Sequence, residues 1–271
     1  MRQKATLPPR TVPTLARYAR VVTTTSPHES VPERIDPLRE PIGVVSHHLV
    51  KYAFARDNLK RGWILDIACG VGYGSAFLAD SMGRVIGVDV SNEAVELARS
   101  RYTSDNCRFI QGDAQKLPIR AGAFDAVVCF EGIEHFAQPE EHLVEVGRVL
   151  RAGGVYLVST PHPGAHTHGA ENPFHLHEFD VTTFRAMLDR FFRSVELLGQ
   201  VRKRTNAHVI AQRADVLGLR RSRWLRPASR FLSRSVLKTR PTEEARLEDF
   251  SIEPWTPEAT EYLAVCRDPR I

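Results

Sequence analysis

Residues 63–75 read WILDIACGVGYGS, and this stretch decides the fold that we expect for the chain. A short apolar run from Trp63 to Ala68, interrupted only by Asp66, leads directly into three alternate glycines, which are Gly70, Gly72 and Gly74. Such a run is typical of a buried strand that ends in a glycine turn before a helix. Because glycine has no Cβ, its backbone can adopt positive φ and approach a ligand closely. The stretch therefore predicts a turn that borders a bound small molecule.

Acidic residues mark the ends of three successive predicted strands. Asp66 lies in the first strand, Asp89 ends a second strand at residues 85–90, and Asp113 follows a third at residues 107–111. Each acid taken alone could be a helix cap or a turn residue. An acid at the end of the second strand can, however, accept hydrogen bonds from both ribose hydroxyls of a nucleoside. A buried acid such as Asp66 also needs a partner, and a cationic ligand group would serve.

Five segments in order resemble the class I S-adenosylmethionine-dependent methyltransferases. They read DIACGVGYG, IGVDVS, GDAQKLP, FDAVVCFEGIEH and RVLRAGGVYLVSTP, within residues 47–200. A nicotinamide dehydrogenase is the main rival, but its turn normally reads G-x-G-x-x-G, whereas this chain has G-x-G-x-G. The resemblance implies that S-adenosylmethionine is the cofactor, with Asp66 and the glycine turn at its methionine part and Asp89 at its ribose. Asp113 and Ala114 would then lie at the adenine.

The same resemblance implies the whole cofactor site and the fold. The cofactor residues would be Tyr52, Asp66, Ala68, Gly70, Gly72, Gly74, Asp89, Val90, Asp113, Ala114 and Phe130. The fold would be α/β and Rossmann-like, with seven mostly parallel strands, an antiparallel last strand, helices on both faces and a helical insertion before the last strand. We expect an N-terminal arm at 1–40, a methyltransferase core at 41–201, a cap insertion at 202–258, and the final core strand within 259–271.

Helix-capping residues indicate where several helices begin. Ser46 precedes an amphipathic pattern at residues 46–59, in which His48 and Tyr52 are candidate walls of the cofactor site or simply core residues. Ser91 and Asp180 are expected to cap two further helices.

Two carboxylates and an imidazole follow the fourth predicted strand, residues 126–130. If this segment is helical, Glu131, Glu134 and His135 project to one side, because they are spaced at i, i+3 and i+4. This set could bind Mg²⁺ or another divalent metal, or it could leave His135 as a base oriented by an acid. It could also be a cofactor-pocket wall in which only Glu131 takes part. The E-x-x-E-H pattern resembles the metal-binding motif of small-RNA 2′-O-methyltransferases, and we predict these three residues to be catalytic.

A histidine-rich stretch follows the fifth predicted strand. Between residues 160 and 179 it contains His162, His166, His168, His175 and His177. Most histidines in an exposed loop are surface residues, but neutral imidazole also ligates metals and accepts protons. The N-P-F-H segment resembles a loop of methyltransferases that act on sugars and glycolipids, which favours the last two. The metal ligands that we predict are Glu131, Glu134, His135, His175 and His177.

These groups indicate a hydroxyl acceptor. An alcohol keeps its proton near pH 7, so its methylation needs a base or a metal, and general-base help is typically worth about 10²- to 10⁴-fold. We therefore predict O-methylation of a small molecule, sugar or glycolipid, as in natural product biosynthesis, with His135 as base or metal ligand. An amino-sugar N-methyltransferase, a metal-dependent RNA 2′-O-methyltransferase and a non-catalytic binding module remain alternatives.

Composition limits the class of protein and its partners. The 271 residues are 42% hydrophobic, which suits a packed globule, and no run of apolar residues approaches the length of a membrane span. Four scattered cysteines indicate buried thiols and a cytoplasmic protein. Residues 202–240 contain twelve Lys or Arg and one acid, a net charge of 12 − 1 = +11. This segment could be a lid, contact an anionic membrane surface or, less favoured, bind RNA, and the chain could form a dimer.

Overall fold

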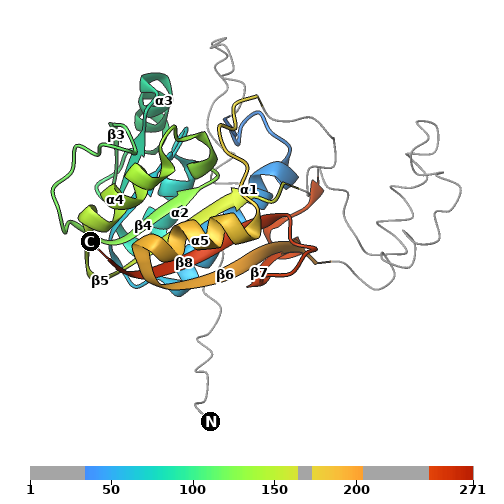
Figure 1. Cartoon of the computed structure of the whole chain (residues 1–271). Helices are drawn as coiled ribbons and strands as arrows, with labels where there is room; N and C mark the ends of the chain where they lie inside the picture. Colours follow the sequence, from blue (N-terminus) through green and yellow to red (C-terminus); the bar gives the residue numbers. More distant parts are fainter. Residues whose placement is uncertain (1–33, 164–172, 204–243, 271) are drawn as a thin grey trace, which may run out of the picture.

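The computed structural model describes residues 34–163, 173–203 and 244–270 (Figure 1). The first half contains α1 (Ile42–Asn58), β1 (Gly62–Ile67), α2 (Tyr73–Met82), β2 (Gly83–Asp89), α3 (Asn92–Tyr102), β3 (Cys107–Gln111) and β4 (Phe124–Phe130). The second half contains η2 (Ile133–His135), α4 (Pro139–Val149), β5 (Leu150–Pro161), α5 (Val181–Phe191), β6 (Phe192–Arg202), η5 (Leu247–Asp249), β7 (Phe250–Pro254) and β8 (Glu261–Pro269). The two η elements are single turns of 3₁₀ helix.

All of these strands form one mixed sheet in the order β3-β2-β1-β4-β5-β8-β6-β7. The five strands from β3 to β5 are parallel, and β8 runs antiparallel to both of its neighbours, β5 and β6. The strand order reverses between β1 and β4, because the chain first builds outward through β2 and β3 and then returns to the other side of β1. In open α/β sheets, ligands bind at such a point, beyond the carboxyl ends of the strands.

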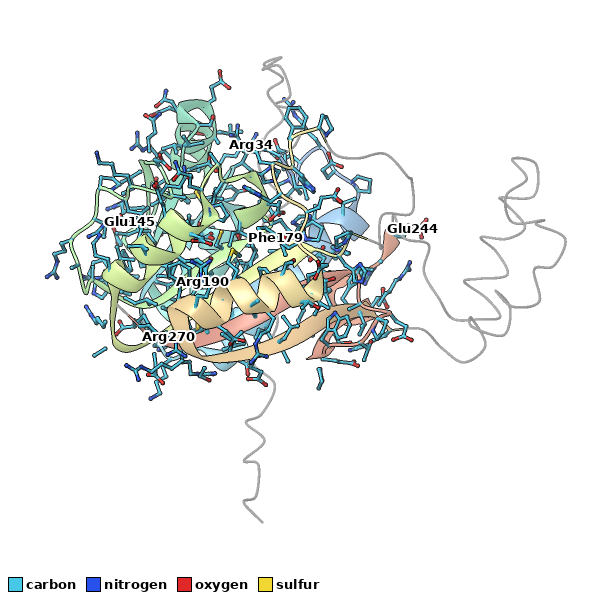
Figure 2. The ribbon with its side chains drawn as sticks, viewed as in Figure 1. Arg34, Glu145, Phe179, Arg190, Glu244 and Arg270 are labelled. Carbon is cyan, nitrogen blue, oxygen red and sulfur yellow. The ribbon has the colours of Figure 1, made fainter. Side chains whose placement is uncertain are left out.

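Helices cover both faces of the sheet (Figure 1). Ile64 packs with residues of α1, α2 and α3 on one face, whereas its neighbours in β1, Leu65 and Ile67, pack with residues of α4 and α5 on the other. This alternation is what a strand buried on both sides requires, and it explains why β1 is apolar except at Asp66. On the outer surface Arg190 of α5, labelled in Figure 2, pairs with Glu140 of α4, which joins the two helices of that face.

The expected α/β sheet with an antiparallel strand near its end is confirmed, with differences in detail. The sheet has eight strands among the described residues rather than seven. The additional strand, β7, pairs with β6 at the sheet edge, within the 202–258 segment for which we expected helix. The part of that segment at 204–243, which includes most of its arginines, lies outside the described residues.

Helix starts were predicted with mixed success. Ser91 accepts a hydrogen bond from the backbone N–H of Ala94 (3.3 Å), and Asp180 accepts one from that of Thr182 (2.7 Å), so both predicted caps are confirmed. The predicted start at Ser46 is wrong, because α1 begins at Ile42 directly after Pro41. Pro41 is the N-cap residue, and its side chain makes no capping hydrogen bond.

Two expectations from composition can also be compared with the structure. All four cysteines are free thiols with buried side chains, as expected. Among the described residues, no helix combines the length and the apolar character needed to cross a membrane.

Candidate active site

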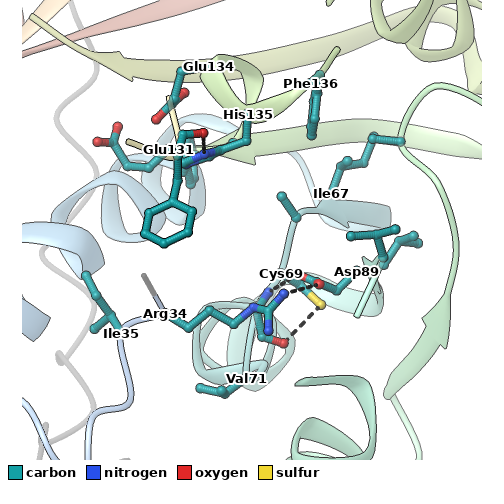
Figure 3. Close-up of a pocket in the computed structure, with 18 of the residues that line it drawn as sticks. Arg34, Ile35, Ile67, Cys69, Val71, Asp89, Glu131, Glu134, His135 and Phe136 are labelled. Atoms are coloured by element: carbon teal, nitrogen blue, oxygen red, sulfur yellow. Dashed lines mark hydrogen bonds and ion pairs between the residues drawn. The ribbon is translucent and has the colours of Figure 1, made fainter. Parts of the chain in front are cut away.

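A cavity of about 900 Å³ lies at the carboxyl ends of the strands, where the strand order reverses. This volume is within the range that holds small ligands and cofactors. Figure 3 shows two groups of polar side chains on its wall: Arg34 and Asp89 near the glycine turn, and Glu131, Glu134 and His135 after β4.

The glycine turn borders the cavity through Gly70. Its φ is +53°, and a Cβ built at this position would have no atom within 4 Å, so the backbone faces open space. The other two glycines are needed for packing. A Cβ on Gly72 would lie 2.7 Å from a ring carbon of Phe109, and one on Gly74 would lie 2.1 Å from Cζ of Tyr52. Only the first glycine is therefore placed to touch a ligand directly.

Asp66 lies beneath the cavity wall rather than in it. Its side chain is fully buried and accepts hydrogen bonds from Ser75 Oγ (2.6 Å) and Tyr52 Oη (3.3 Å). Burial raises the pKa of Asp66 to about 7, although the two hydroxyl donors oppose this shift. Because Tyr52 does line the cavity, Asp66 acts on the site by holding the tyrosine and the start of α2.

Asp89 organises the end of β2. One carboxylate oxygen accepts a hydrogen bond from the backbone N–H of Gly70 (2.8 Å), and the other accepts one from Ser91 N–H (3.0 Å). Arg34, from the segment before α1, places Nη2 3.4 Å from the second oxygen and also lines the cavity (Figure 3). Asp89 thus joins the glycine turn to α3, while its carboxylate meets a cation in the cavity wall.

The far side of the cavity is formed by the chain after β4. Glu131 has φ +52°, a conformation that typically costs a non-glycine residue of order 1–3 kcal/mol. Ser159 Oγ donates a hydrogen bond to Glu131 Oε1 (2.7 Å), and Lys51 Nζ lies 3.4 Å from the same oxygen. Burial raises the pKa of Glu131 to about 7, with Glu261 raising it and Lys51 lowering it.

Glu134, His135 and His175 come together although they lie far apart in the sequence. One ligand atom of each is within 4.8 Å of those of the other two. Glu134 is 1% exposed, and neither of its carboxylate oxygens makes a hydrogen bond of normal geometry within the part of the chain that the structure describes. Burial, together with the nearby charge of Glu131, raises the pKa of Glu134 well above its ordinary value. A buried carboxylate beside two imidazoles is a donor set suited to a divalent cation.

Backbone contacts hold His175 against this cluster. The carbonyl of Phe174 accepts a hydrogen bond from Nδ1 of His135 (3.0 Å), which places the lone pair of the neutral ring on Nε2. The backbone N–H groups of Leu176 and His177 donate to the carbonyl of Glu134 (2.9 and 3.1 Å). The segment 174–177 is thereby fixed to η2, and the rings of His135 and His175 lie 5.0 Å apart in an edge-to-face arrangement.

The cavity contains most of the residues predicted from the sequence. Those that line it are His48, Tyr52, Ala68, Gly70, Asp89, Val90, Asp113, Ala114, Phe130, Glu131, Glu134, His135 and His175. Those that do not line it are Asp66, Gly72, Gly74 and His177. His177 stacks on Phe179 instead, and His162 packs against Tyr262, while His166 and His168 lie outside the described residues.

Sequence reasoning missed four residues at this site: Arg34, Lys51, Ser159 and Glu261. One signal was available. Lys51 stands in an otherwise apolar stretch of α1, and a lysine on a buried helix face requires an acidic partner. Nothing in the sequence, however, pairs it with Glu261, which is 210 residues away.

Comparison with known proteins finds a methyltransferase domain in the chain. Residues 65–158 match the methyltransferase domain family. A relative in Mycolicibacterium smegmatis, described as a probable S-adenosylmethionine-dependent methyltransferase, is 37% identical over 149 residues, which cover 54% of this chain and 55% of the relative. Residues 65–158 are thus a methyltransferase domain, and the chain is similar in sequence to S-adenosylmethionine-dependent methyltransferases.

Two further methyltransferases show the range of the similarity. A fatty-acid O-methyltransferase of M. smegmatis is 34% identical over 111 residues, which cover 40% of each chain. The crystal structure of a possible histamine N-methyltransferase from Thermotoga maritima superposes with a TM-score of 0.57 at 16% identity, covering 83% of this chain and 92% of that one. The latter similarity shows the fold alone. The chain matches 55% of the length of the first of these sequence relatives and 40% of the second.

The cavity suits S-adenosylmethionine, the cofactor of the methyltransferases that this chain resembles. Open space beside Gly70 leaves the backbone accessible, and the carboxylate of Asp89 lies next to it at the end of β2. A diol-binding acid and a backbone that a ligand can approach closely are what a nucleoside cofactor requires. Asp113 and Ala114 line the same wall.

Proposed function

We propose that the chain is an S-adenosylmethionine-dependent O-methyltransferase that acts on a hydroxyl group of a small molecule, sugar or glycolipid. The observation that carries this proposal is the cluster of Glu134, His135 and His175 in the same cavity as Gly70 and Asp89. The relative described as a fatty-acid O-methyltransferase supports oxygen as the accepting atom and adds fatty acids to the acceptors worth testing.

The cluster supports a hydroxyl acceptor because a hydroxyl needs help to lose its proton. S-adenosylmethionine, when bound, supplies an activated methyl group on a sulfonium, so the protein must chiefly orient the acceptor and take its proton. His135 is suited to that role, since the Phe174 carbonyl fixes its tautomer with the lone pair on Nε2. Its neighbours Glu134 and His175 are within 4.8 Å and can orient the ring or the acceptor.

A metal-assisted version of the reaction uses the same residues differently. Glu134, His135 and His175 would hold a divalent cation such as Mg²⁺, whose chemistry is to lower the pKa of an oxygen bound to it. The buried carboxylate of Glu134 supports this version, because a cation would offset the cost of burying its charge.

A screen for methyl transfer tests the proposal. The purified chain would be incubated with labelled S-adenosylmethionine and with hydroxylated sugars, glycolipids, polyketides and fatty acids, each beside an amine analogue. Transfer to an oxygen, lost in His135→Ala, is the expected result. Transfer to amines alone would contradict it. Activity that survives exhaustive chelation would leave His135 as a base and remove the metal version.

A further inference from the structure

Lys51 is a fully buried lysine that reaches the cavity wall from α1. Its side chain is 0% exposed, and Nζ pairs with Glu261 Oε2 and lies 3.4 Å from Glu131 Oε1. Two acids therefore share one cation. Glu131 lines the cavity, whereas Glu261 does not.

Glu261 anchors this lysine to the other half of the sheet. It begins β8, and its second oxygen pairs with Nε2 of His47, one turn before Lys51 in α1. Burial disfavours the charged forms of both Glu261 and Lys51. The charges of Lys51 and His47 nevertheless hold the pKa of Glu261 well below its usual value. The two acids in turn raise the pKa of Lys51. The position of Nζ is thus fixed from outside the cavity.

Two side chains meet Glu131 at the same carboxylate oxygen. Ser159 Oγ (2.7 Å) and Lys51 Nζ (3.4 Å) both lie at Oε1, and among the described residues no hydrogen bond is made by Oε2. The backbone N–H of Glu131 also donates to Ser159 Oγ (3.1 Å), which secures the strained residue at positive φ. Ser159 and Lys51 therefore hold the Glu131 carboxylate at Oε1, and Glu131 lines the cavity.

A purely stabilising role explains this arrangement poorly. Moving a lysine and two acids out of water is costly, and a buried ion pair often stabilises a protein no better than apolar side chains of the same size. Strained residues such as Glu131 persist where the surroundings over-determine them, and they are concentrated at functional sites.

We infer that Lys51 is a positioning residue: with Ser159 it holds Oε1 of Glu131 so that Oε2 can accept a hydrogen bond from an O–H or N–H group of a bound ligand. The inference rests on the proposed function only in one respect, since that donor can belong to the methyl acceptor. It can also belong to the ammonium group of S-adenosylmethionine, which a binding experiment reports without any acceptor.

Two measurements on the full chain separate these sources. Calorimetric titration with S-adenosylmethionine reports the cofactor, and kcat and KM for an acceptor found by the screen report the acceptor. A hydrogen bond to a charged group typically contributes about 10- to 100-fold in binding. We expect Lys51→Met and Glu131→Gln to lower the same quantity, either the cofactor affinity or kcat/KM for the acceptor, by a similar factor. Lys51→Arg should lower it less.

The double variant Lys51→Met/Glu131→Gln decides whether the two residues act together. If Lys51 acts through Glu131, the double variant loses no more affinity or activity than the single variant that shows the larger loss. Losses that multiply, or a Lys51→Met variant with unchanged cofactor affinity and unchanged acceptor kinetics, would overturn the inference. A wild-type chain that methylates no acceptor contradicts the proposed function, and the cofactor titration then decides the inference alone.

Two more variants serve as controls for effects on folding. Lys51→Met/Glu261→Gln removes both charges of the buried pair, and it replaces Lys51→Met in both measurements should the single variant fail to fold. Arg148→Met breaks an ion pair with Glu145 that lies outside the cavity, and it should change neither measurement.

Discussion

Asp66 shows how a single buried acid makes stability depend on pH. Its pKa in the folded chain is about 7 because of burial, compared with 3.8 in an exposed chain. Between these values the folded state binds more protons than the unfolded state, so this residue's contribution to stability falls as pH rises towards 7 and then levels off. The serine and tyrosine hydroxyls that donate to it can also donate to the amide oxygen of asparagine.

Asp66→Asn should remove that dependence. At 1.36 kcal/mol per pH unit, the two units between pH 5 and 7 give an upper bound of about 3 kcal/mol. We expect urea unfolding to show that the wild type loses up to this amount relative to Asp66→Asn between pH 5 and 8. A difference between the two proteins that stays constant over this range would show that Asp66 is ionised throughout.

Glu134 and His175 can be tested for metal binding without measuring activity. Replacing either residue by glutamine removes one member of the cluster, and we expect the affinity for Mn²⁺, measured by calorimetry, to fall at least about tenfold. His177→Gln is the matched control, because His177 lies two residues further along but stacks on Phe179 outside the cluster. Equal losses in all three variants, or no binding to the wild type, would contradict the metal version of the site.

At the scale of elements, the glycine turn and α2 depend on how closely α1 approaches. Gly74→Ala gains helix propensity but places a Cβ 2.1 Å from the ring of Tyr52, so the ring or α1 must move. We expect a loss of about 1–3 kcal/mol in the free energy of unfolding, together with weaker cofactor binding, because Tyr52 lines the cavity. Calorimetry and urea unfolding would measure both.

Gly70→Ala provides the contrast. The new Cβ meets open space, so only the positive φ carries a cost, about 1 kcal/mol. If Gly74→Ala proved as mild as this control, α1 would be more adaptable than its packing indicates.

Elements with strong local signals were predictable, and those that depend on distant partners were not. The apolar run of β1, the caps Ser91 and Asp180 and the glycine turn carry their information within a few residues. β7 is a short edge strand whose pairing partner, β6, lies about fifty residues earlier, and its sequence FSIEP has no clear alternation. The spacing of Glu131, Glu134 and His135 suggested a helix, but the chain forms a 3₁₀ turn preceded by a residue at positive φ.

The same distinction applies to the site. Acids at strand ends follow from the strand pattern, whereas the partners of Lys51 depend on how α1 meets β8. Similarly, His175 could be proposed because its loop is rich in histidine, but its contact with His135 depends on backbone hydrogen bonds to η2.

At the scale of the whole molecule, α1 connects the cavity to the antiparallel half of the sheet. Its carbonyl at His47 accepts a hydrogen bond from Gln200 of β6 (2.9 Å), and Lys51 pairs with Glu261 of β8. On the other side, Asp89 connects the glycine turn to α3. A ligand that occupies the cavity would therefore contact segments anchored to both halves of the sheet, and its binding should stabilise the molecule as a unit.

Binding of S-adenosylmethionine should raise the melting temperature of the whole chain, and Asp89→Ala should abolish that rise. A ligand at 100 times its dissociation constant stabilises a folded protein by about 2.7 kcal/mol, if it does not bind the unfolded chain. Because Asp89→Ala also removes hydrogen bonds to Gly70 and Ser91, each variant must be compared with its own cofactor-free state. Asp125→Asn is the control, since Asp125 pairs with Arg151 near the start of β4, away from the cavity. A cofactor-induced rise that persists in Asp89→Ala would mean that the ribose is held elsewhere.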